Sequence, residues 1–209
     1  MDMKHKVLGG AEPFEFGGSQ LSATVKDFWA WSMSRLIADG PRGDLAEFIV
    51  NTALGMDMSE PKRGWGECDI VYPYKDKLIR IEVKCSTLLQ AWDRDTPSKP
   101  TFSISKTYPC DIREYEGGYR YVGRGPSPDL RRRSDIYVFC LFSEQNRQKA
   151  WPLDLGQWQF YVVPTASIDD KLGDQRRISM QGLERIGAVE CDYGGIKQEI
   201  DSIAGSIKA

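Results

Sequence analysis

The stretch ECDIVYPYKDKLIRIEVK, residues 67–84, contains two strand-like runs on either side of a turn. The turn lies within residues 73–76, where proline, tyrosine, lysine and aspartate follow one another. With Lys75 and Asp76 at the centre of the turn, the two runs pair as an antiparallel hairpin. The stretch therefore predicts a sheet, and its register can be worked out residue by residue.

This register separates the side chains of the hairpin onto two faces. The pairs of the apolar face are Ile70 with Ile81, Tyr72 with Ile79 and Cys68 with Val83. On the other face Asp69 lies opposite Glu82, and Val71 lies opposite Arg80, with directly opposed Cβ atoms about 5 Å apart. Lys84 shares the face of Glu82 because strand side chains alternate. A slip of one residue would turn the acids toward the core, so the apolar pattern supports this register.

Two carboxylates that face each other repel, and a bound cation would offset that repulsion. Mg²⁺ takes oxygen ligands, commonly one or two carboxylates together with water and substrate phosphate. Asp69 and Glu82 are therefore candidate ligands of Mg²⁺ or Mn²⁺, with Lys84 beside the attacking water. The alternative is a solvated hairpin face whose acids are neutralised by Lys84 and Arg80.

A further acid lies upstream on a predicted amphipathic helix, residues 43–55. The expected buried stripe consists of Leu45, Phe48, Ile49 and Thr52. Glu47 lies beside that stripe, and Gly55 ends the helix. Glu47 is a candidate third ligand, and the alternative is an exposed helix glutamate.

At these residues the chain resembles the PD-(D/E)XK nuclease superfamily. The matching residues are Glu47, Asp69 and the run from Glu82 to Lys84, with Cys68 where the superfamily name has a proline. Residues 81–92, 134–142 and 151–164 are also similar to a group of bacterial proteins assigned to this fold. The superfamily motif covers roughly residues 43–92, and the similarity to the group extends to about residue 190.

The resemblance implies an α/β, restriction-endonuclease-like fold with a central mixed β-sheet flanked by helices. It also implies a metal-dependent nuclease that acts on DNA, in restriction, repair or phage defence, and it allows a homodimer. Asp69, Glu82 and Glu47 would act with the backbone carbonyl of Val83 in binding metal, while Lys84 orients the water. The competing hypothesis is a catalytically inactive protein of this fold that binds nucleic acid or a partner.

Candidate nucleic-acid contacts follow the hairpin and recur in basic clusters. Ser86 and Gln90 come just after the third strand of the motif, and their alternatives are a helix cap and a helix surface. Arg131, Arg132 and Arg133 form a run that could clamp phosphates or remain a solvated loop face. Further basic candidates are Lys99, Lys106, Arg124, Arg176 and Arg177.

Composition sets bounds on the class of protein. The 209 residues are 41% hydrophobic, which predicts one domain, residues 1–209, with residues 1–18 as a loosely ordered arm. The net charge of −2 does not by itself indicate nucleic-acid binding. Five cysteines without a CxxC motif and a single histidine argue against structural zinc. Without an apolar leader or a membrane span, a cytoplasmic protein is expected.

The remaining elements complete the expected fold. We expect a helix over residues 21–38, with a buried stripe of Val25, Phe28, Trp29, Met33 and Leu36. Residues 136–142 are continuously apolar and predict a central strand covered on both faces. Other expected strands are residues 101–106 and 160–163, other expected helices are residues 179–186 and 196–203, and residues 113–134 are expected to be a long loop.

Overall fold

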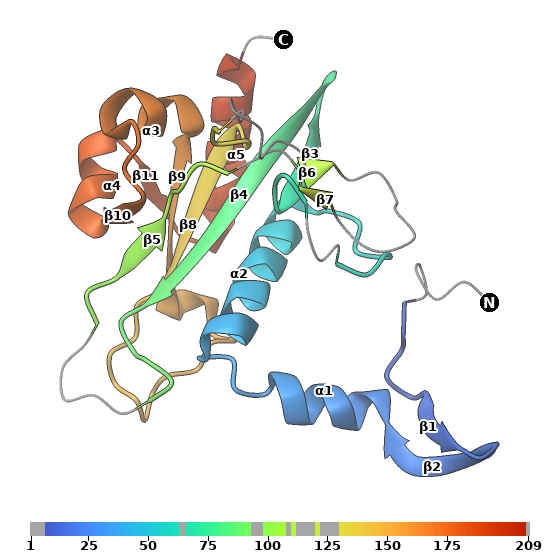
Figure 1. Cartoon of the computed structure of the whole chain (residues 1–209). Helices are drawn as coiled ribbons and strands as arrows, with labels where there is room; N and C mark the ends of the chain where they lie inside the picture. The colour runs from blue at the N-terminus through green and yellow to red at the C-terminus, as the bar shows by residue number, and fades with distance from the viewer. Residues whose placement is uncertain are drawn as a thin grey trace.

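A five-stranded mixed sheet forms the centre of the structure (Figure 1). This computed structural model describes residues 7–62, 66–92, 98–107, 110–111, 120–121 and 130–207. The strand order is β11-β9-β8-β4-β3, and only β4 and β8 run parallel. The strands are β3 Ile70–Tyr74, β4 Lys77–Thr87, β8 Ile136–Phe142, β9 Trp158–Pro164 and β11 Val189–Cys191. The fold is therefore α/β with a mixed central sheet, as predicted.

The predicted register of the hairpin is confirmed along the whole β3–β4 ladder. The paired residues are Ile70 with Ile81, Val71 with Arg80, Tyr72 with Ile79, Pro73 with Leu78 and Tyr74 with Lys77. Lys75 has a positive φ of 55°, as a tight turn requires. Alternation of apolar residues was sufficient to fix the register, because only one alignment buries all of them.

Helices cover both faces of the sheet, and each face has its own apolar core. One core lies against α2 Asp39–Leu54 and α5 Ile196–Ser206. The other lies against α3 Thr165–Leu172, α4 Met180–Ile186 and the pair of β5 Thr101–Ser103 with β10 Arg177–Ser179. Every residue of β8 is buried, which confirms the prediction of a doubly covered central strand. Short 3₁₀ helices, Leu155–Gln157 and Tyr193–Gly195, connect elements around the sheet.

The helix that carries Glu47 is longer than predicted and buries a different stripe. It begins at Asp39 rather than after Pro41, because the first helical N–H groups have no intrahelical partner and proline is tolerated there. Gly55 ends it in the left-handed conformation, as predicted. The buried residues are Arg42, Ala46, Ile49, Val50 and Leu54, whereas Phe48 is exposed. The expected stripe was therefore wrong by about one residue around the helix.

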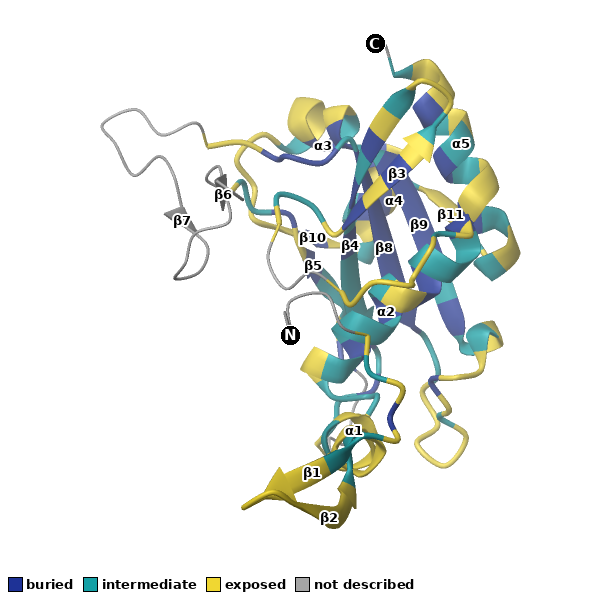
Figure 2. Ribbon diagram, turned by 90° about the vertical axis from the view of Figure 1, so that its right-hand side faces the viewer, coloured by how far each residue is buried: buried dark blue, intermediate teal, exposed yellow. Residues whose placement is uncertain are grey.

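The N-terminal part differs more strongly from the prediction. β1 Pro13–Phe16, expected in the loose arm, pairs with β2 Ser19–Thr24, where a helix was expected to begin at residue 21, and this hairpin leads into the shorter α1 Val25–Met33. Thr24 begins the helix with a capping box to Asp27. The predicted buried stripe of α1 is wrong, because no residue of this helix is buried. The hairpin and α1 extend away from the sheet (Figure 2), so their apolar side chains have no core to enter.

The last two predicted helices are present. α4 follows Ser179, whose side chain caps Gly182, and α5 extends three residues beyond its predicted end. Within the predicted loop 113–134, β7 Arg120–Tyr121 pairs with β6 Cys110–Asp111, and most of the other loop residues lie outside the described part of the chain. Among the described helices, none is both long enough and apolar enough to cross a bilayer.

The register makes a prediction about stability that compares two faces of one hairpin. Ile81 is 0% exposed and Val71 is 48% exposed. We expect Ile81→Ala to lower the free energy of unfolding by about 2–5 kcal/mol, because it leaves a cavity in the core. Val71→Ala should cost less than about 1 kcal/mol, because that side chain is largely in water. Urea unfolding of both variants tests this, and a slipped register would reverse their order.

Candidate active site

The two strands of the β3–β4 hairpin stop pairing next to Asp69, the first of the predicted acids. The β3–β4 ladder ends at the pair of Ile70 and Ile81, so Asp69 lies just outside it and the predicted pair of Asp69 with Glu82 is not formed. The Asp69 N–H donates to the Ile81 carbonyl at 3.1 Å, and the Asp69 carboxylate accepts the N–H of Val83 at 2.7 Å. A side chain thus replaces the next main-chain rung. No described strand pairs with β4 on this edge beyond Ile81, although the other edge stays paired to β8 as far as Thr87.

The second acid and the lysine lie on this unpaired half of β4. Glu82 and Lys84 point to the same side of the sheet, and their side chains form an ion pair. Glu82 is 18% exposed and Lys84 is 29% exposed. Arg80 does not share in this neutralisation, because its guanidinium binds Asp135 at 2.9 Å. Of the two bases that could neutralise the acids, therefore, only Lys84 contacts one of them.

Glu47 reaches the same place from α2, accompanied by a lysine that the sequence did not single out. The Lys62 ammonium binds Glu47 at 2.8 Å and Asp44 at 2.5 Å. Lys62 follows a proline in the segment between α2 and β3, and no motif marks it. The site therefore holds four predicted residues, Glu47, Asp69, Glu82 and Lys84, with a second lysine, Lys62, at its rim.

The charges of this cluster act on one another. Burial raises the pKa of Glu82, and the charges of Asp69 and Glu47 raise it further against the opposing effect of Lys84. Burial also raises the pKa of Glu47, where the hydrogen bond from Lys62 opposes it and Asp69 adds to it. For Lys84, burial acts to lower the pKa, but the charges of the acids outweigh it and the pKa is raised. The three acids therefore form one electrostatic unit.

The chemistry of this cluster suits a hard divalent cation. Its donors are carboxylate oxygens, which Mg²⁺ prefers, and their mutual repulsion would be relieved by a positive ion. In the arrangement observed each acid already has a protein donor, namely Val83, Lys84 or Lys62. Within the described part of the chain no three acidic, cysteine or histidine side chains are grouped as a complete ligand set. Binding an ion would require the acids to exchange these donors for it.

Cys68, which stands where the superfamily name has a proline, lies beside the acids. Burial raises the pKa of its thiol to about 11, with added effects from the charges of Glu82 and Asp69. Its Sγ contacts the Ile70 carbonyl at 3.5 Å, and the predicted pair with Val83 is not formed. Because the thiol stays protonated at neutral pH, Cys68 is not a nucleophile here.

Ser86 lies within β4 and Gln90 follows its end, but no helix follows β4 directly. Thr87 instead closes a tight turn, accepting the N–H of Leu89 at 3.0 Å and donating to its carbonyl at 2.8 Å. The Gln90 amide donates to the Ser98 hydroxyl at 2.7 Å. Both alternatives that assumed a following helix are therefore wrong. Ser86 lies on the same side of β4 as Lys84, because side chains alternate along a strand.

The three consecutive arginines are divided between surface and interior. Arg131 is exposed, whereas Arg132 and Arg133 are each only 5% exposed. Arg132 binds Asp169 at 2.5 Å and donates to the carbonyls of Ile104, Gly173 and Gln175. Arg133 approaches Glu67 at 3.8 Å. The predicted phosphate clamp is not present as a set, because two of its members are used inside the protein.

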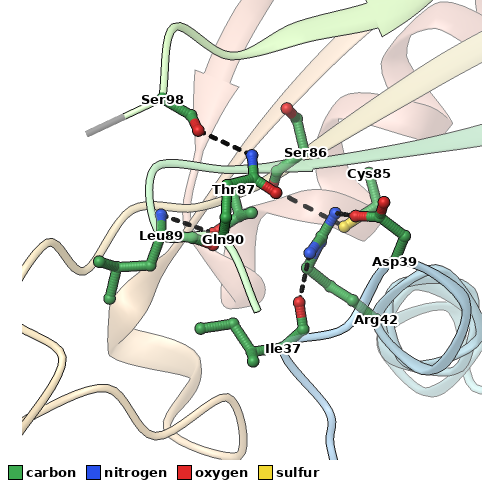
Figure 3. Close-up of polar contacts among 9 residues, drawn as sticks. All are labelled: Ile37, Asp39, Arg42, Cys85, Ser86, Thr87, Leu89, Gln90 and Ser98. Carbon is green, nitrogen blue, oxygen red and sulfur yellow. Dashed lines mark hydrogen bonds and ion pairs between the residues drawn. The ribbon is translucent and has the colours of Figure 1, made fainter. Parts of the chain in front are cut away.

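A cavity of about 500 Å³ opens beyond the acids, at the end of β4 and the start of α2 (Figure 3). Its lining includes Ser86 and Gln90 from the sequence prediction, together with the basic candidates Lys99 and Arg177. Arg42 also lines it and was missed, because it lies in the first turn of α2, before the predicted start of that helix at residue 43. Comparisons with protein-family models, with curated proteins and with solved structures give no match to this chain.

The division of the arginines makes a prediction with a matched control. We expect Arg132→Ala to lower the free energy of unfolding by about 3 kcal/mol, because it leaves buried carbonyl groups without a donor. Arg131→Ala should change it by less than about 0.5 kcal/mol, as is usual at an exposed position. Chemical denaturation measures both variants, and equal effects would contradict the structural role of Arg132.

Proposed function

We propose that this chain is a metal-dependent nuclease of PD-(D/E)XK type that hydrolyses phosphodiester bonds in DNA. The observation that carries the proposal is the meeting of Glu47, Asp69, Glu82 and Lys84 at the unpaired half of β4. They come from a helix, the start of one strand and the middle of the next. We extend the proposal to a cytoplasmic enzyme of restriction, repair or phage defence.

The side chains of Glu47 and Glu82 are each only 18% exposed, which favours function over a solvated surface, whereas Asp69 beside them is exposed. An exposed acidic face keeps its charges apart in water, whereas here burial and mutual repulsion raise the pKa of Glu47 and of Glu82. Such perturbed groups gather at functional sites. A lysine held against an acid in the same place gives the cluster both an anionic and a cationic side.

Each residue has a role in the proposed hydrolysis. Asp69, Glu82 and Glu47 would hold Mg²⁺ or Mn²⁺, with the Val83 carbonyl as a further oxygen. The ion, when bound, lowers the pKa of water and stabilises charge on the phosphoryl oxygens. Lys84 would donate hydrogen bonds to the attacking water and orient it toward phosphorus. Its raised pKa keeps it protonated at neutral pH, so it acts as a donor and not as a base.

One observation favours an alternative, a protein of this fold that binds nucleic acid or a partner without cutting. Each of the three acids is engaged by a donor of the protein itself, and Lys62 occupies the rim beside Glu47. If these contacts persist in the presence of Mg²⁺, the acids stay closed to it. The two functions therefore differ in metal binding as well as in cleavage.

The nuclease proposal predicts the loss of cleavage in defined variants. With Mg²⁺ or Mn²⁺ and duplex, single-stranded or branched DNA, Lys84→Ala should slow cutting by about 10²–10³-fold, the range for a lost hydrogen-bond donor in an active site. Asp69→Asn should slow it by about 10³-fold, since it removes several kcal/mol of metal-derived stabilisation. Asp76→Asn, at the turn of the same hairpin, is the control and should cut normally. If both site variants still cut DNA at the normal rate, Lys84 and Asp69 do not belong to the active site.

The position of Lys62 predicts a change in metal affinity without any assay of activity. Lys62→Ala should tighten Mg²⁺ binding a few-fold, because it removes a competing cation whose partly exposed ion pair is worth at most about 1 kcal/mol. Titration calorimetry with Mg²⁺ alone measures this. Lys62→Arg keeps the charge and should bind Mg²⁺ like the original chain. Weaker binding by Lys62→Ala would show that Lys62 supports the site and does not compete for it.

A further inference from the structure

The cavity beyond the acids has a composition different from theirs. Its wall includes three basic residues, two polar residues and one aromatic residue. They are Arg42, Lys99, Arg177, Ser86, Gln90 and Trp92. They come from the first turn of α2, the end of β4 and the segments that carry β5 and β10. A volume of about 500 Å³ falls in the range of pockets that hold a small organic ligand.

The cavity is continuous with the proposed active site along two elements. Ser86 follows Lys84 on the same side of β4, about 6.6 Å further along the strand. On α2, Gly43 lines the cavity and lies one helical turn before Glu47. A polymeric ligand whose reacting group lies at the acids would therefore reach the cavity with the next one or two of its repeating units.

The charged residues of the cavity wall are three bases, Arg42, Lys99 and Arg177, and one acid, Asp39, so the cavity carries a net positive charge where the active site carries a negative one. Arg42 is paired with Asp39 at 2.6 Å, and its buried Nε has no hydrogen-bond partner among the described residues. Lys99 and Arg177 have no carboxylate partner within the described part of the chain, and Arg177 donates to the Thr101 hydroxyl at 2.7 Å. Two basic groups beside a hydroxyl wall suit a phosphate.

The wall next to Trp92 is held in place before any ligand arrives. Arg35 donates to the Ala91 carbonyl at 3.0 Å, and Arg147 donates to the carbonyls of Gln90 and Trp92 at 3.1 and 3.0 Å. Gln90 is tied to Ser98 across the cavity (Figure 3). Trp92 lines the cavity and is 56% exposed, so it is accessible to a ligand there.

We propose that this cavity holds one unpaired nucleotide of a nucleic-acid strand whose neighbouring phosphodiester lies at the acids. The phosphate contacts Lys99, Arg177 and the Ser86 hydroxyl, and the base stacks on Trp92, as bases do on aromatic side chains. A base inside a duplex cannot enter a pocket without leaving its stack. The inference rests on the proposed nuclease function and narrows its substrate to single strands or to unpaired ends.

The test measures binding with EDTA present, so that no hydrolysis takes place. A labelled oligothymidine and a blunt duplex of equal length are titrated with the whole chain, and fluorescence anisotropy is followed. We expect the single strand to bind more tightly than the duplex. Lys99→Ala with Arg177→Gln should weaken single-strand binding at least tenfold, and Trp92→Ala about tenfold.

Matched controls separate the cavity from general attraction. Lys149→Ala with Arg185→Gln removes the same charge from exposed positions elsewhere, and Trp151→Ala removes an exposed indole. Both controls should retain nearly full single-strand binding. Thymidine monophosphate should displace the oligonucleotide at a lower concentration than inorganic phosphate does.

Four outcomes would overturn the proposal. They are equal losses in the cavity and control variants, a duplex that binds as well as the single strand, retained binding in all cavity variants, and equal displacement by phosphate and nucleotide. Failure of the nuclease proposal looks different, because it removes Mg²⁺-dependent cutting and leaves this binding intact. If the protein cuts DNA but the cavity variants bind single strands normally, only the proposal that the cavity holds a nucleotide is overturned.

Discussion

The hydrogen bond from the Val83 N–H to the Asp69 carboxylate is the contact on which the rest of the site depends. A continuous hairpin would satisfy that N–H with a main-chain carbonyl and would cover the edge of β4 with another strand. Here a side chain satisfies it, so the buried donor has a partner while the first strand turns away. The unpaired half of β4 is then open to α2, which brings in Glu47. The same separation of strands leaves room for the cavity beyond Lys84.

Burying several acids together is unfavourable, and the structure offsets it with lysines from different elements. Lys84 comes from the same strand as Glu82, and Lys62 comes from a connecting segment beside Glu47. A buried charge needs a partner, so in the absence of an ion these amines are what permit the acids to remain charged. An arrangement of this kind can exchange one cation for another at modest cost, because Lys62 is half exposed and loses little on moving into water.

The features that could be predicted from the sequence were those set by neighbouring residues of one strand or turn, and not those set by contacts between distant elements. Period-two alternation fixed the β3–β4 register, and it put Glu82, Lys84 and Ser86 on one side without any knowledge of the fold. Helix faces were harder. A helix buries whatever side its neighbours cover, and because no residue of α1 is buried, the apolar stripe predicted for it was wrong. Lys62 and the roles of Arg42 and Arg132 could not be predicted, since their partners are set by tertiary contacts.

The small net charge becomes compatible with nucleic-acid binding once each charge is assigned to its neighbours. The buried Arg132 and Arg42 are each paired with a more exposed acid, Asp169 and Asp39, so the two pairs add little to an outward field. Near the site the remaining charges are separated by sign, with acids around Glu82 and basic groups at Lys99 and Arg177. A field of this kind acts over roughly one Debye length, about 8–10 Å, so it would orient a bound strand without drawing in distant DNA. Under the proposal, recognition would depend on the fit of one nucleotide, for which a basic surface over the whole protein is not needed.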